Sequence, residues 1–462
     1  MNGRRRRAHR EGLSMSVSML TGTGIGATLL TAAAAVSATW REYSHGDGRS
    51  PAPGGNAWHR RRHPARGAEK TADASDANIP QSVSLVIPAH NEESSIAETL
   101  RSCHQQSYPI DQIIVIADNC SDRTAEIARS MGAAVIEGKG GSKALAQNLA
   151  LPRITSDAVV ALDGDATLSP RAVELMMDTL RSGCAGTCTS ARPKDTSTIY
   201  SQYRTLYHAI SNGWARPMQD VLQRQLVLSG MANCHRMDVL RAAGGFPDHT
   251  ITEDFNLTWM LHRGDHRVRF TPGAFVYTQE PTSWAELVSQ MHRWTAGFAQ
   301  TMVRHRAPLL DSASFIVVGS QVIDAFIGGV AIFGLPFYLA RQGPARGLCT
   351  WWSPLWVAIG AASIGVAVRQ LGWRTTVRCL PGWLALQCLT GPLTAWWLFR
   401  EWVLGRHLTT WTGRHGRRPA LTPMSRSRKA ALAAGACATA ALAAHRHLGR
   451  PAAAARARRR LG

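Results

Sequence analysis

The sequence has few features of a disulfide-bonded secreted protein. Its nine cysteines are odd in number and scattered, and Cys184 and Cys188 form the one close pair. Disulfide frameworks use paired cysteines at regular spacings. We therefore expect reduced thiols, most of them small buried apolar side chains.

A glycine-rich dinucleotide loop is also missing. The first apolar run of the chain ends in Pro88, Ala89, His90 and Asn91, where a GxGxxG loop would stand in a dinucleotide-binding domain. This absence argues against a nicotinamide-dependent dehydrogenase. It leaves other nucleotide ligands open.

Acidic residues are scarce, most of all near the C-terminus. The chain has 52 Lys and Arg against 31 Asp and Glu, and from Arg400 onward fourteen basic residues face a single acid, Glu401. A basic tail can bind nucleic acid. Beside long apolar segments, however, it is more typical of the cytoplasmic face of a membrane.

The first 80 of the 462 residues read as an appended basic region. Residues 17–38 are weakly apolar but rich in Gly and Thr. This segment could be a signal anchor, a single transmembrane helix, or neither. The Pro-, Gly- and Arg-rich linker that follows, up to residue 80, has few large apolar residues. We expect it to be disordered.

Residues 81–306 have the texture of an α/β domain. Short apolar runs (SLVIPA, QIIVIAD, AAVIEG and AVVALD) alternate with segments of helical period. Alternation of this kind predicts helices packed on a mainly parallel sheet. The helices are expected at residues 92–106, 124–131, 142–150, 171–181, 251–261 and 284–302.

Residues 307–400 contain long apolar segments, and residues 401–462 form the basic tail. The apolar segments 313–340, 351–368 and 380–399 approach the ~20 residues that a membrane helix needs, and 430–444 is a weaker, alanine-rich candidate. Three crossings would put the Arg-rich stretch after residue 400 on the wrong side for the positive-inside tendency. Either one segment lies in the membrane interface or residues 430–444 return the chain.

The stretch AVVALDGDA, residues 158–166, indicates a ligand site. Five apolar residues suit a strand buried on both faces, and such strands present ligand-binding groups at their carboxyl ends. Residues two apart on an extended segment point the same way, so Asp163 and Asp165 can converge on one hard cation, Mg²⁺ or Mn²⁺, across Gly164. A solvated loop is the simpler alternative.

Four motifs stand in a characteristic order: Asp118 in IADNCSD, Asp163-Gly164-Asp165, Thr252-Glu253-Asp254, and Gln290 to Trp294 (QMHRW). Singly, each has a plainer explanation; acids favour a helix N-terminus, and Trp favours membrane interfaces. Together they resemble the processive, membrane-embedded family 2 glycosyltransferases, which include hyaluronan, chitin, cellulose and poly-N-acetylglucosamine synthases. The resemblance covers residues 82–306 and the general layout after them.

This resemblance implies a GT-A, Rossmann-like nucleotide-sugar-binding domain followed by transmembrane helices. Asp254 would be the catalytic general base, and Asp163 and Asp165 would hold the metal and the diphosphate. The substrate-binding residues would be Glu92, Asp118, Lys143, Asp163, Glu253, Gln290, Arg293 and Trp294. Glu92 and Asp118 would contact the uridine with Lys143 nearby. Ala117 stands where the family often has another Asp.

The chemistry explains these residue types. In an inverting transfer the acceptor hydroxyl attacks the anomeric carbon while uridine diphosphate leaves. One carboxylate must take a proton, and a cation must neutralise the departing diphosphate. Arg293 offers a fork of donors for phosphate oxygens, and Trp294 offers a ring on which a sugar can stack.

The sequence thus predicts a metal-dependent polymerising β-glycosyltransferase, a multi-pass cell-membrane protein with its catalytic domain in the cytoplasm. Its partners would be a UDP-sugar, a carbohydrate acceptor and the lipid bilayer, with no nucleic acid. N-acetylglucosamine is the first choice of sugar, because Gly297 completes an RWxxG pattern like that of the poly-N-acetylglucosamine synthases. No FxVT-type gating loop is present, which disfavours a bacterial cellulose synthase. The alternatives are a single-transfer enzyme acting on a lipid and a membrane-anchored nucleic-acid binder.

Overall fold

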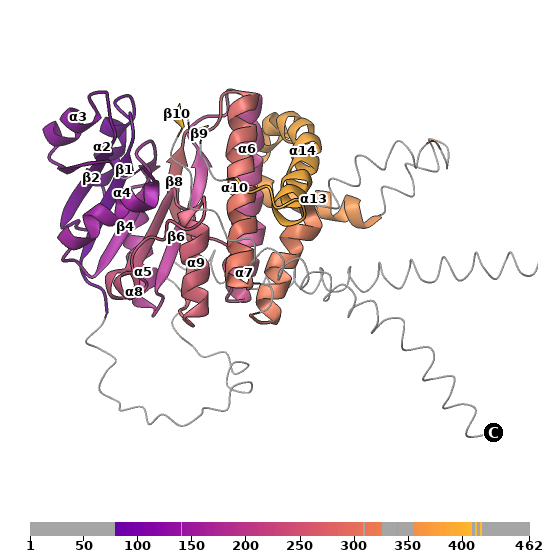
Figure 1. Ribbon diagram of the computed structural model, residues 1–462. Coiled ribbons are helices and arrows are strands. Elements are labelled where there is room, and N and C mark those ends of the chain that lie inside the picture. The colour runs from indigo at the N-terminus through magenta and orange to yellow at the C-terminus, as the bar shows by residue number, and fades with distance from the viewer. Residues whose placement is uncertain are drawn as a thin grey trace, which may run out of the picture.

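The computed structural model describes residues 79–139, 141–307, 310–325, 340, 354–408, 412–413 and 416–417 (Figure 1). The predicted N-terminal segment 17–38, almost all of the linker that follows it, and the alanine-rich segment 430–444 lie outside the described residues. Within them, the predicted α/β domain is present.

The first half of the domain is a parallel α/β unit. Its strands are β1 (Val83–Ala89), β2 (Gln112–Asp118), β3 (Ala134–Gly138) and β4 (Ala158–Leu162). They lie in the order β3-β2-β1-β4 with every pair parallel. The connecting helices are α2 (Ile96–His104), α3 (Thr124–Ser130) and α4 (Lys143–Ala150), which match three predicted helices to within a few residues.

The second half extends the same sheet to eight strands. The elements that follow are β5 (Thr167–Leu168), α5 (Ala172–Arg181), β6 (Gly186–Pro193), α6 (Ile199–Ile210), α7 (Arg216–Val221), β7 (Ala232–Arg236), α8 (Met237–Ala242), α9 (Glu253–Arg263) and β8 (Val268–Thr278). The strand β7 runs antiparallel between β4 and β6, whereas β6 and β8 are parallel. The sheet is therefore mixed but mostly parallel, as the sequence predicts.

The sheet has an apolar layer on each face. Val83, Leu85 and Ile87 of β1 pack under α2, α3 and α5, whereas Val86 of the same strand packs toward α4, α8 and α9. Side chains alternate along a strand, so a strand that is apolar at nearly every position must be covered on both sides. The result is a three-layer α/β/α arrangement, seen in Figure 1 as the indigo and magenta region.

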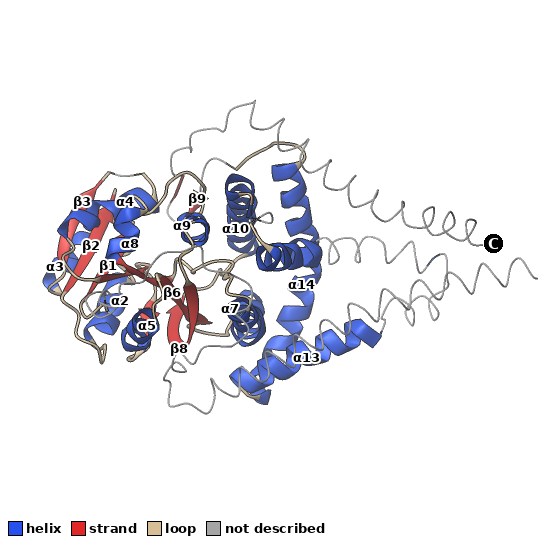
Figure 2. Cartoon of the chain, turned by 90° about the horizontal axis from the view of Figure 1, so that it is seen from below, coloured by secondary structure: helices blue, strands red, loops and turns tan. Residues whose placement is uncertain are grey.

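Long helices stand beside this domain. α10 (Trp284–His305) begins at Ser283, whose hydroxyl accepts a hydrogen bond from the N–H of Glu286 at 3.3 Å. It packs against α9 through a cluster that includes Trp259, Phe298 and Met302. Beyond it lie α13 (Pro354–Leu371) and α14 (Trp373–Trp402) (Figures 1 and 2). The helix α14 packs against α6 and α10, and α13 packs against α6 and α14.

The predicted membrane segments are helical where the structure describes them. Residues 312–325 are helical, α13 covers residues 354–368 of the segment predicted at 351–368, and α14 covers the segment predicted at 380–399. Residues 326–339 and 351–353 lie outside the described residues. No helix in the described part of the chain combines the length and the apolar composition that crossing a bilayer requires. Membrane crossing therefore stays a prediction.

Candidate active site

The predicted nucleotide residues follow neighbouring parallel strands. β1 and β2 are paired up to Ala89 and Ala117, and Asp118 ends β2. Glu92 follows β1 in the loop before α2, and Asp163 follows β4. The carboxyl ends of parallel strands share one edge of the sheet. The parallel strands therefore place Glu92, Asp118 and Asp163 along one edge of the sheet, as predicted.

Asp118 is deeply buried at that edge. Its side chain and backbone together are 2% exposed, and its carbonyl accepts a hydrogen bond from Nδ1 of His90 at 2.7 Å. His90 therefore joins the loop after β1 to the end of β2. A role of Asp118 toward uridine stays a prediction.

The segment Asp163-Gly164-Asp165 forms a turn, not a continuation of β4. The N–H of Ala166 donates to the carbonyl of Asp163 at 3.2 Å, and the hydroxyl of Thr99 donates to the carbonyl of Gly164 at 2.9 Å. The prediction that Asp163 and Asp165 lie on one extended segment is therefore wrong, whereas their convergence on one cation stays a prediction. The strand ends at Leu162 because the turn is held from α2.

Gly164 permits a close approach of two loops. A Cβ at this position would lie 3.2 Å from Cγ of Glu92 and 3.3 Å from the carbonyl oxygen of Pro88. The aspartate turn is therefore packed directly against Glu92. The structure brings this predicted substrate residue to the predicted metal pair.

Lys143 joins the two acidic motifs. It is the first residue of α4, which is capped by the hydroxyl of Ser142. Its Nζ lies 2.6 Å from Oδ1 of Asp163 and 3.0 Å from Oε1 of Glu253, and it donates to the carbonyl of Gly230 at 2.9 Å. One ammonium group therefore holds together residues that are 90 positions apart in the sequence. We call Lys143, Asp163, Gly230, Glu253 and Asp254 the lysine cluster.

The charges of this cluster are strongly coupled. Burial alone would lower the pKa of Lys143, but Asp163 and Glu253 beside it raise that pKa above its ordinary value. Burial likewise favours a raised pKa for Glu253, yet Lys143, with a contribution from Arg293, holds that pKa below its ordinary value. Lys143 and Glu253 are therefore an ion pair at neutral pH.

The pKa of Asp254, the predicted base, is raised instead of lowered. Desolvation, reinforced by the negative charge of Glu253, raises its pKa to about 6. Its Oδ2 accepts from the N–H of Gly230 at 2.8 Å, and its Oδ1 accepts from the N–H of Phe255 at 2.8 Å. The carboxyl group is thus held in one orientation and takes up a proton close to neutral pH, which suits acid–base chemistry.

Gly230 is a site residue that the sequence analysis did not assign. Its N–H contacts Asp254 and its carbonyl contacts Lys143. A Cβ here would lie 3.0 Å from Nζ of Lys143, 3.1 Å from Asp254 and 3.2 Å from Glu253. A side chain here would require these three groups to move by a few tenths of an ångström. The glycine in LSGMAN is the signal that could have identified it.

Helix α10 brings Arg293 of the QMHRW motif close to the lysine cluster. Arg293 lies close enough to Glu253 to lower the pKa of that carboxyl. Oε1 of Gln290 is buried, and among the described residues nothing donates a hydrogen bond to it. Buried polar atoms are almost always paired, so an unpaired acceptor here is consistent with a site that a ligand completes.

The register of α10 against α9 is set by Gly297. A Cβ on Gly297 would lie 2.0 Å from Oγ1 of Thr252, the residue that precedes Glu253 and Asp254. Only a glycine allows α10 to approach this closely. The RWxxG pattern therefore has a packing role, which does not distinguish one sugar from another.

Trp294 remains partly exposed one turn before Gly297. Its ring lies 4.5 Å from the guanidinium carbon of Arg204 on α6. The structure thus places each predicted residue at the sheet edge or on the adjoining helices. The lysine cluster is joined by direct contacts, and Trp294 is linked to α6.

The aspartate turn has a donor set that suits a divalent cation. Among the described residues no group of three or more His, Cys, Asp or Glu side chains gathers in a metal-binding arrangement. Mg²⁺ is commonly held by one or two carboxylates with substrate phosphates supplying further oxygens. Asp163 and Asp165 meet that requirement in chemical type. Asp163 also neutralises Lys143.

Comparisons with known proteins agree with this geometry. The chain is 25% identical over 240 residues to poly-β-1,6-N-acetyl-D-glucosamine synthase of Staphylococcus epidermidis (strain ATCC 35984), covering 50% of this chain and 58% of that protein. It is 26% identical over 337 residues to the uncharacterized glycosyltransferase YaiP of Escherichia coli (strain K12), covering 70% and 76%. The chain therefore spans less than two thirds of the synthase.

Among solved structures, a mannosyltransferase from Pyrobaculum calidifontis in complex with GDP-mannose and Mn²⁺ matches with a TM-score of 0.46 at 18% identity, over 69% of this chain and 87% of that one. A family model described as glycosyltransferase-like family 2 matches residues 80–297. That range contains the whole mixed sheet, the lysine cluster and most of α10. Residues 80–297 are therefore similar to the family 2 glycosyltransferases.

Proposed function

We propose that this protein transfers a sugar from a UDP-sugar to a growing β-linked polysaccharide, with inversion at the anomeric carbon. N-acetylglucosamine is the proposed sugar. It is supported by the similarity to the staphylococcal poly-N-acetylglucosamine synthase, at 25% identity.

One observation carries the proposal. Lys143 contacts both Asp163 of the aspartate turn and Glu253 of the second acidic motif, and the next residue, Asp254, has a pKa raised to about 6. The group proposed to hold the metal and the diphosphate is thus linked by contacts to a group able to accept a proton. That pairing is what an inverting transfer requires.

In the proposed reaction Asp254 takes the proton of the acceptor hydroxyl. The hydroxyl oxygen forms a bond to the anomeric carbon while the bond from that carbon to the diphosphate oxygen breaks, and UDP leaves. Gly230 orients the base through its N–H. Arg293 offers donors to the diphosphate oxygens, and Trp294 offers an aromatic face to the acceptor sugar.

Asp163 and Asp165 would hold Mg²⁺ or Mn²⁺ together with the diphosphate. When bound, the cation would neutralise negative charge on the leaving group. Nζ of Lys143 lies 2.6 Å from Oδ1 of Asp163 and orients that carboxylate. Asp118 and Glu92 would contact the uridine from the loops after β2 and β1.

A membrane location on the cytoplasmic face is part of the proposal. Support comes from α14, where several large apolar side chains are exposed to solvent, among them Trp373 at 63%, Val377 at 59% and Trp396 at 51%. Arg374 and Arg378 lie on the same helix. Exposed tryptophan and arginine side chains on an apolar helix are typical of a membrane–water interface.

The test is a transfer assay on membranes that carry the full-length protein. UDP-sugars are offered one at a time with Mg²⁺ or Mn²⁺, and UDP release and product size are measured. Release with UDP-N-acetylglucosamine together with a long product supports the proposal. A single sugar on a lipid would favour the lipid-glycosylating alternative, and no release with any UDP-sugar would reject the function.

A further inference from the structure

A second charged group lies within the helices beside the active site. Arg204 on α6 is only 1% exposed, and its partner Glu280, in the loop between β8 and α10, is 7% exposed. Nε of Arg204 donates to Oε2 of Glu280 at 2.9 Å. A charge buried this deeply is costly unless it is paired, so the pair is well fixed once formed.

Further contacts fix the orientation of the guanidinium. Its Nη2 donates to Nε2 of His208 at 3.1 Å, one turn along α6. The hydroxyl of Thr278 donates to the other oxygen of Glu280 at 2.9 Å. Burial and the charge of Arg204 lower the pKa of His208, so His208 is neutral at pH 7 and serves as an acceptor. Carboxylate and imidazole therefore hold the guanidinium from two directions.

The face of this guanidinium meets aromatic rings. Cζ of Arg204 lies 4.5 Å from the centre of the Trp294 ring and 4.8 Å from that of Tyr207. Both distances are within the range of a cation–π contact, which is worth more when it is shielded from water. Trp294 thus rests against a side chain that cannot move without breaking buried hydrogen bonds.

We propose that Arg204 is a positioning residue, which Glu280 and His208 lock in place so that Trp294 keeps the orientation needed to stack on the acceptor sugar. This inference rests on the proposed function. It adds that α6, which contributes no predicted site residue, sets the affinity for the acceptor. The Arg204–Glu280 pair would then act in acceptor binding as well as in the stability of the fold.

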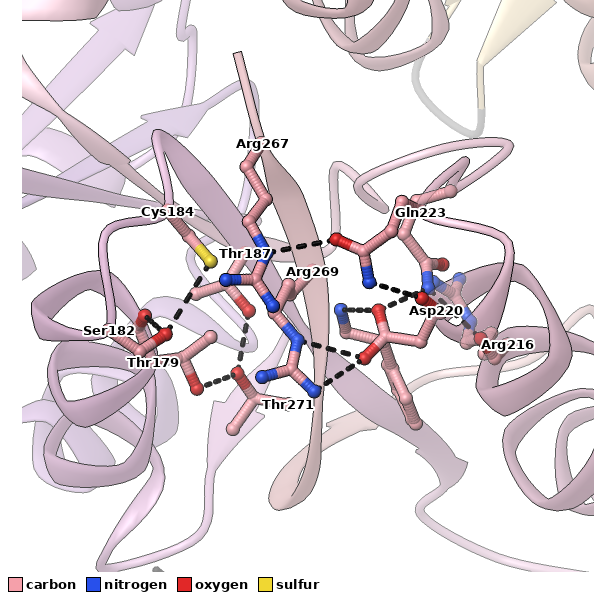
Figure 3. A network of polar contacts seen from close by, with 12 residues as sticks. Thr179, Ser182, Cys184, Thr187, Arg216, Asp220, Gln223, Arg267, Arg269 and Thr271 are labelled. Carbon is pink, nitrogen blue, oxygen red and sulfur yellow. Dashed lines mark hydrogen bonds and ion pairs between the residues drawn. The ribbon is translucent and has the colours of Figure 1, made fainter. Parts of the chain in front are cut away.

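A second buried pair in the same domain provides a matched control. Arg269 and Asp220 are 9% and 5% exposed, and Nη2 of Arg269 lies 3.0 Å from Oδ2 of Asp220 (Figure 3). This pair joins β8 to the end of α7, whereas the Arg204–Glu280 pair joins α6 to the loop before α10. Arg269→Lys therefore disturbs a comparable ion pair in another part of the domain.

The experiment compares Arg204→Lys with Arg269→Lys in full-length protein. Lysine keeps the charge but loses the planar fork that both pairs the carboxylate and stacks on a ring. Steady-state transfer is measured with UDP-N-acetylglucosamine and a short β-linked N-acetylglucosamine oligosaccharide. Binding of that oligosaccharide to the protein without donor is measured by calorimetry.

We expect Arg204→Lys to raise the acceptor KM and the oligosaccharide Kd by roughly 5-fold to 30-fold, with the donor KM unchanged. Arg269→Lys should leave all three unchanged. In a Trp294→Leu background, Arg204→Lys should add no further loss of acceptor affinity, because the ring that it supports is gone. If Arg204→Lys does not fold, Glu280→Gln, of the same shape, should raise the same two constants by a smaller factor.

The inference is overturned if Arg204→Lys and Arg269→Lys behave alike, or if Arg204→Lys weakens acceptor binding equally with and without Trp294. It is also overturned if Glu280→Gln leaves the oligosaccharide Kd unchanged. A wild-type protein that binds the oligosaccharide but transfers nothing would instead reject the proposed function. The binding arm then still tests the role of Arg204.

Discussion

The lysine cluster and the Asp220 network of Figure 3 are built from similar residues but differ in how their charges are balanced. In the Asp220 network, Oδ2 accepts from Arg269, and Oδ1 accepts from Gln225 at 2.7 Å and from the N–H of Phe270 at 3.0 Å. Both oxygens of this carboxylate accept hydrogen bonds, and Arg269 pairs with one of them.

The lysine cluster is unbalanced by comparison. Lys143 contacts the carboxylates of Asp163 and Glu253, and Asp254 stands beside them with a raised pKa. An excess of negative charge costs stability in a closed fold and is retained where a ligand or a proton completes it. The difference separates a network that holds β8 to α7 from one that is arranged for chemistry.

The largest effect is expected from Asp254→Asn. Loss of a general base lowers rates by ~10²-fold to 10⁴-fold, so transfer should nearly cease. Because the folded state holds a proton on Asp254 that the unfolded chain has released between pH 3.8 and about 6, the ionised group destabilises the fold above that window. Thermal unfolding at pH 7.5 should therefore show the variant to be at least as stable as wild type. Marked destabilisation would make Asp254 a structural residue.

A large effect is also expected from pH. Asp254 must be ionised to take a proton, and its pKa lies at about 6. Transfer per enzyme should fall about tenfold for each pH unit below that value. Burial would raise the pKa of Glu253, but Lys143 holds that pKa below its ordinary value. The measurement is kcat/KM for the donor between pH 4.5 and 8; a flat profile across pH 6 would contradict the assignment.

A smaller effect is expected from Gly297→Ala. The added methyl would collide with Thr252, push α10 from α9 and misplace Arg293 and Trp294 relative to Asp254. A misplacement of about 1 Å can cost up to ~10²-fold in rate. Gly360→Ala in α13, where a Cβ meets open space, is the matched control and should transfer at the wild-type rate. Equal activity of the two variants would show that the close packing at Gly297 is not needed for transfer.

The smallest effect on transfer is expected from Arg269→Lys, which is directed at the balanced network. A buried pair that loses its geometry costs up to about 3 kcal/mol of unfolding free energy. Chemical denaturation should report that loss, whereas the transfer rate of the folded enzyme should stay at the wild-type value. A loss of activity without a loss of stability would show that the Asp220 network also takes part in transfer, which contradicts the comparison.

Much of the first half of the domain could be predicted from sequence. β1, β2 and β4 are apolar at nearly every position because both faces are covered, and the helices between them have regular apolar spacing. The strand β7 was not predicted, since its sequence ANCHR is short and polar for a central strand. Its position depends on pairing with β4 and β6, which are distant in sequence.

The site was predicted less completely than the fold. Asp163, Lys143 and Asp254 could be selected by type and order. That the ammonium of Lys143 joins Asp163 to Glu253 required knowing that α4 starts beside both. Gly230 and Arg204 act through contacts with residues far along the chain; Arg204 and Glu280 are 76 positions apart. Local sequence patterns carry no information about such contacts.

The central claim is that the two acidic motifs share one site and divide its work, Asp163 and Asp165 holding the diphosphate and Asp254 the proton. The most direct measurement is the affinity for UDP with Mn²⁺, compared between Asp165→Asn and Asp254→Asn. We predict that Asp165→Asn loses the Mn²⁺-dependent part of UDP binding while Asp254→Asn binds UDP as wild type does. Equal loss in both variants, or loss in neither, would contradict the account.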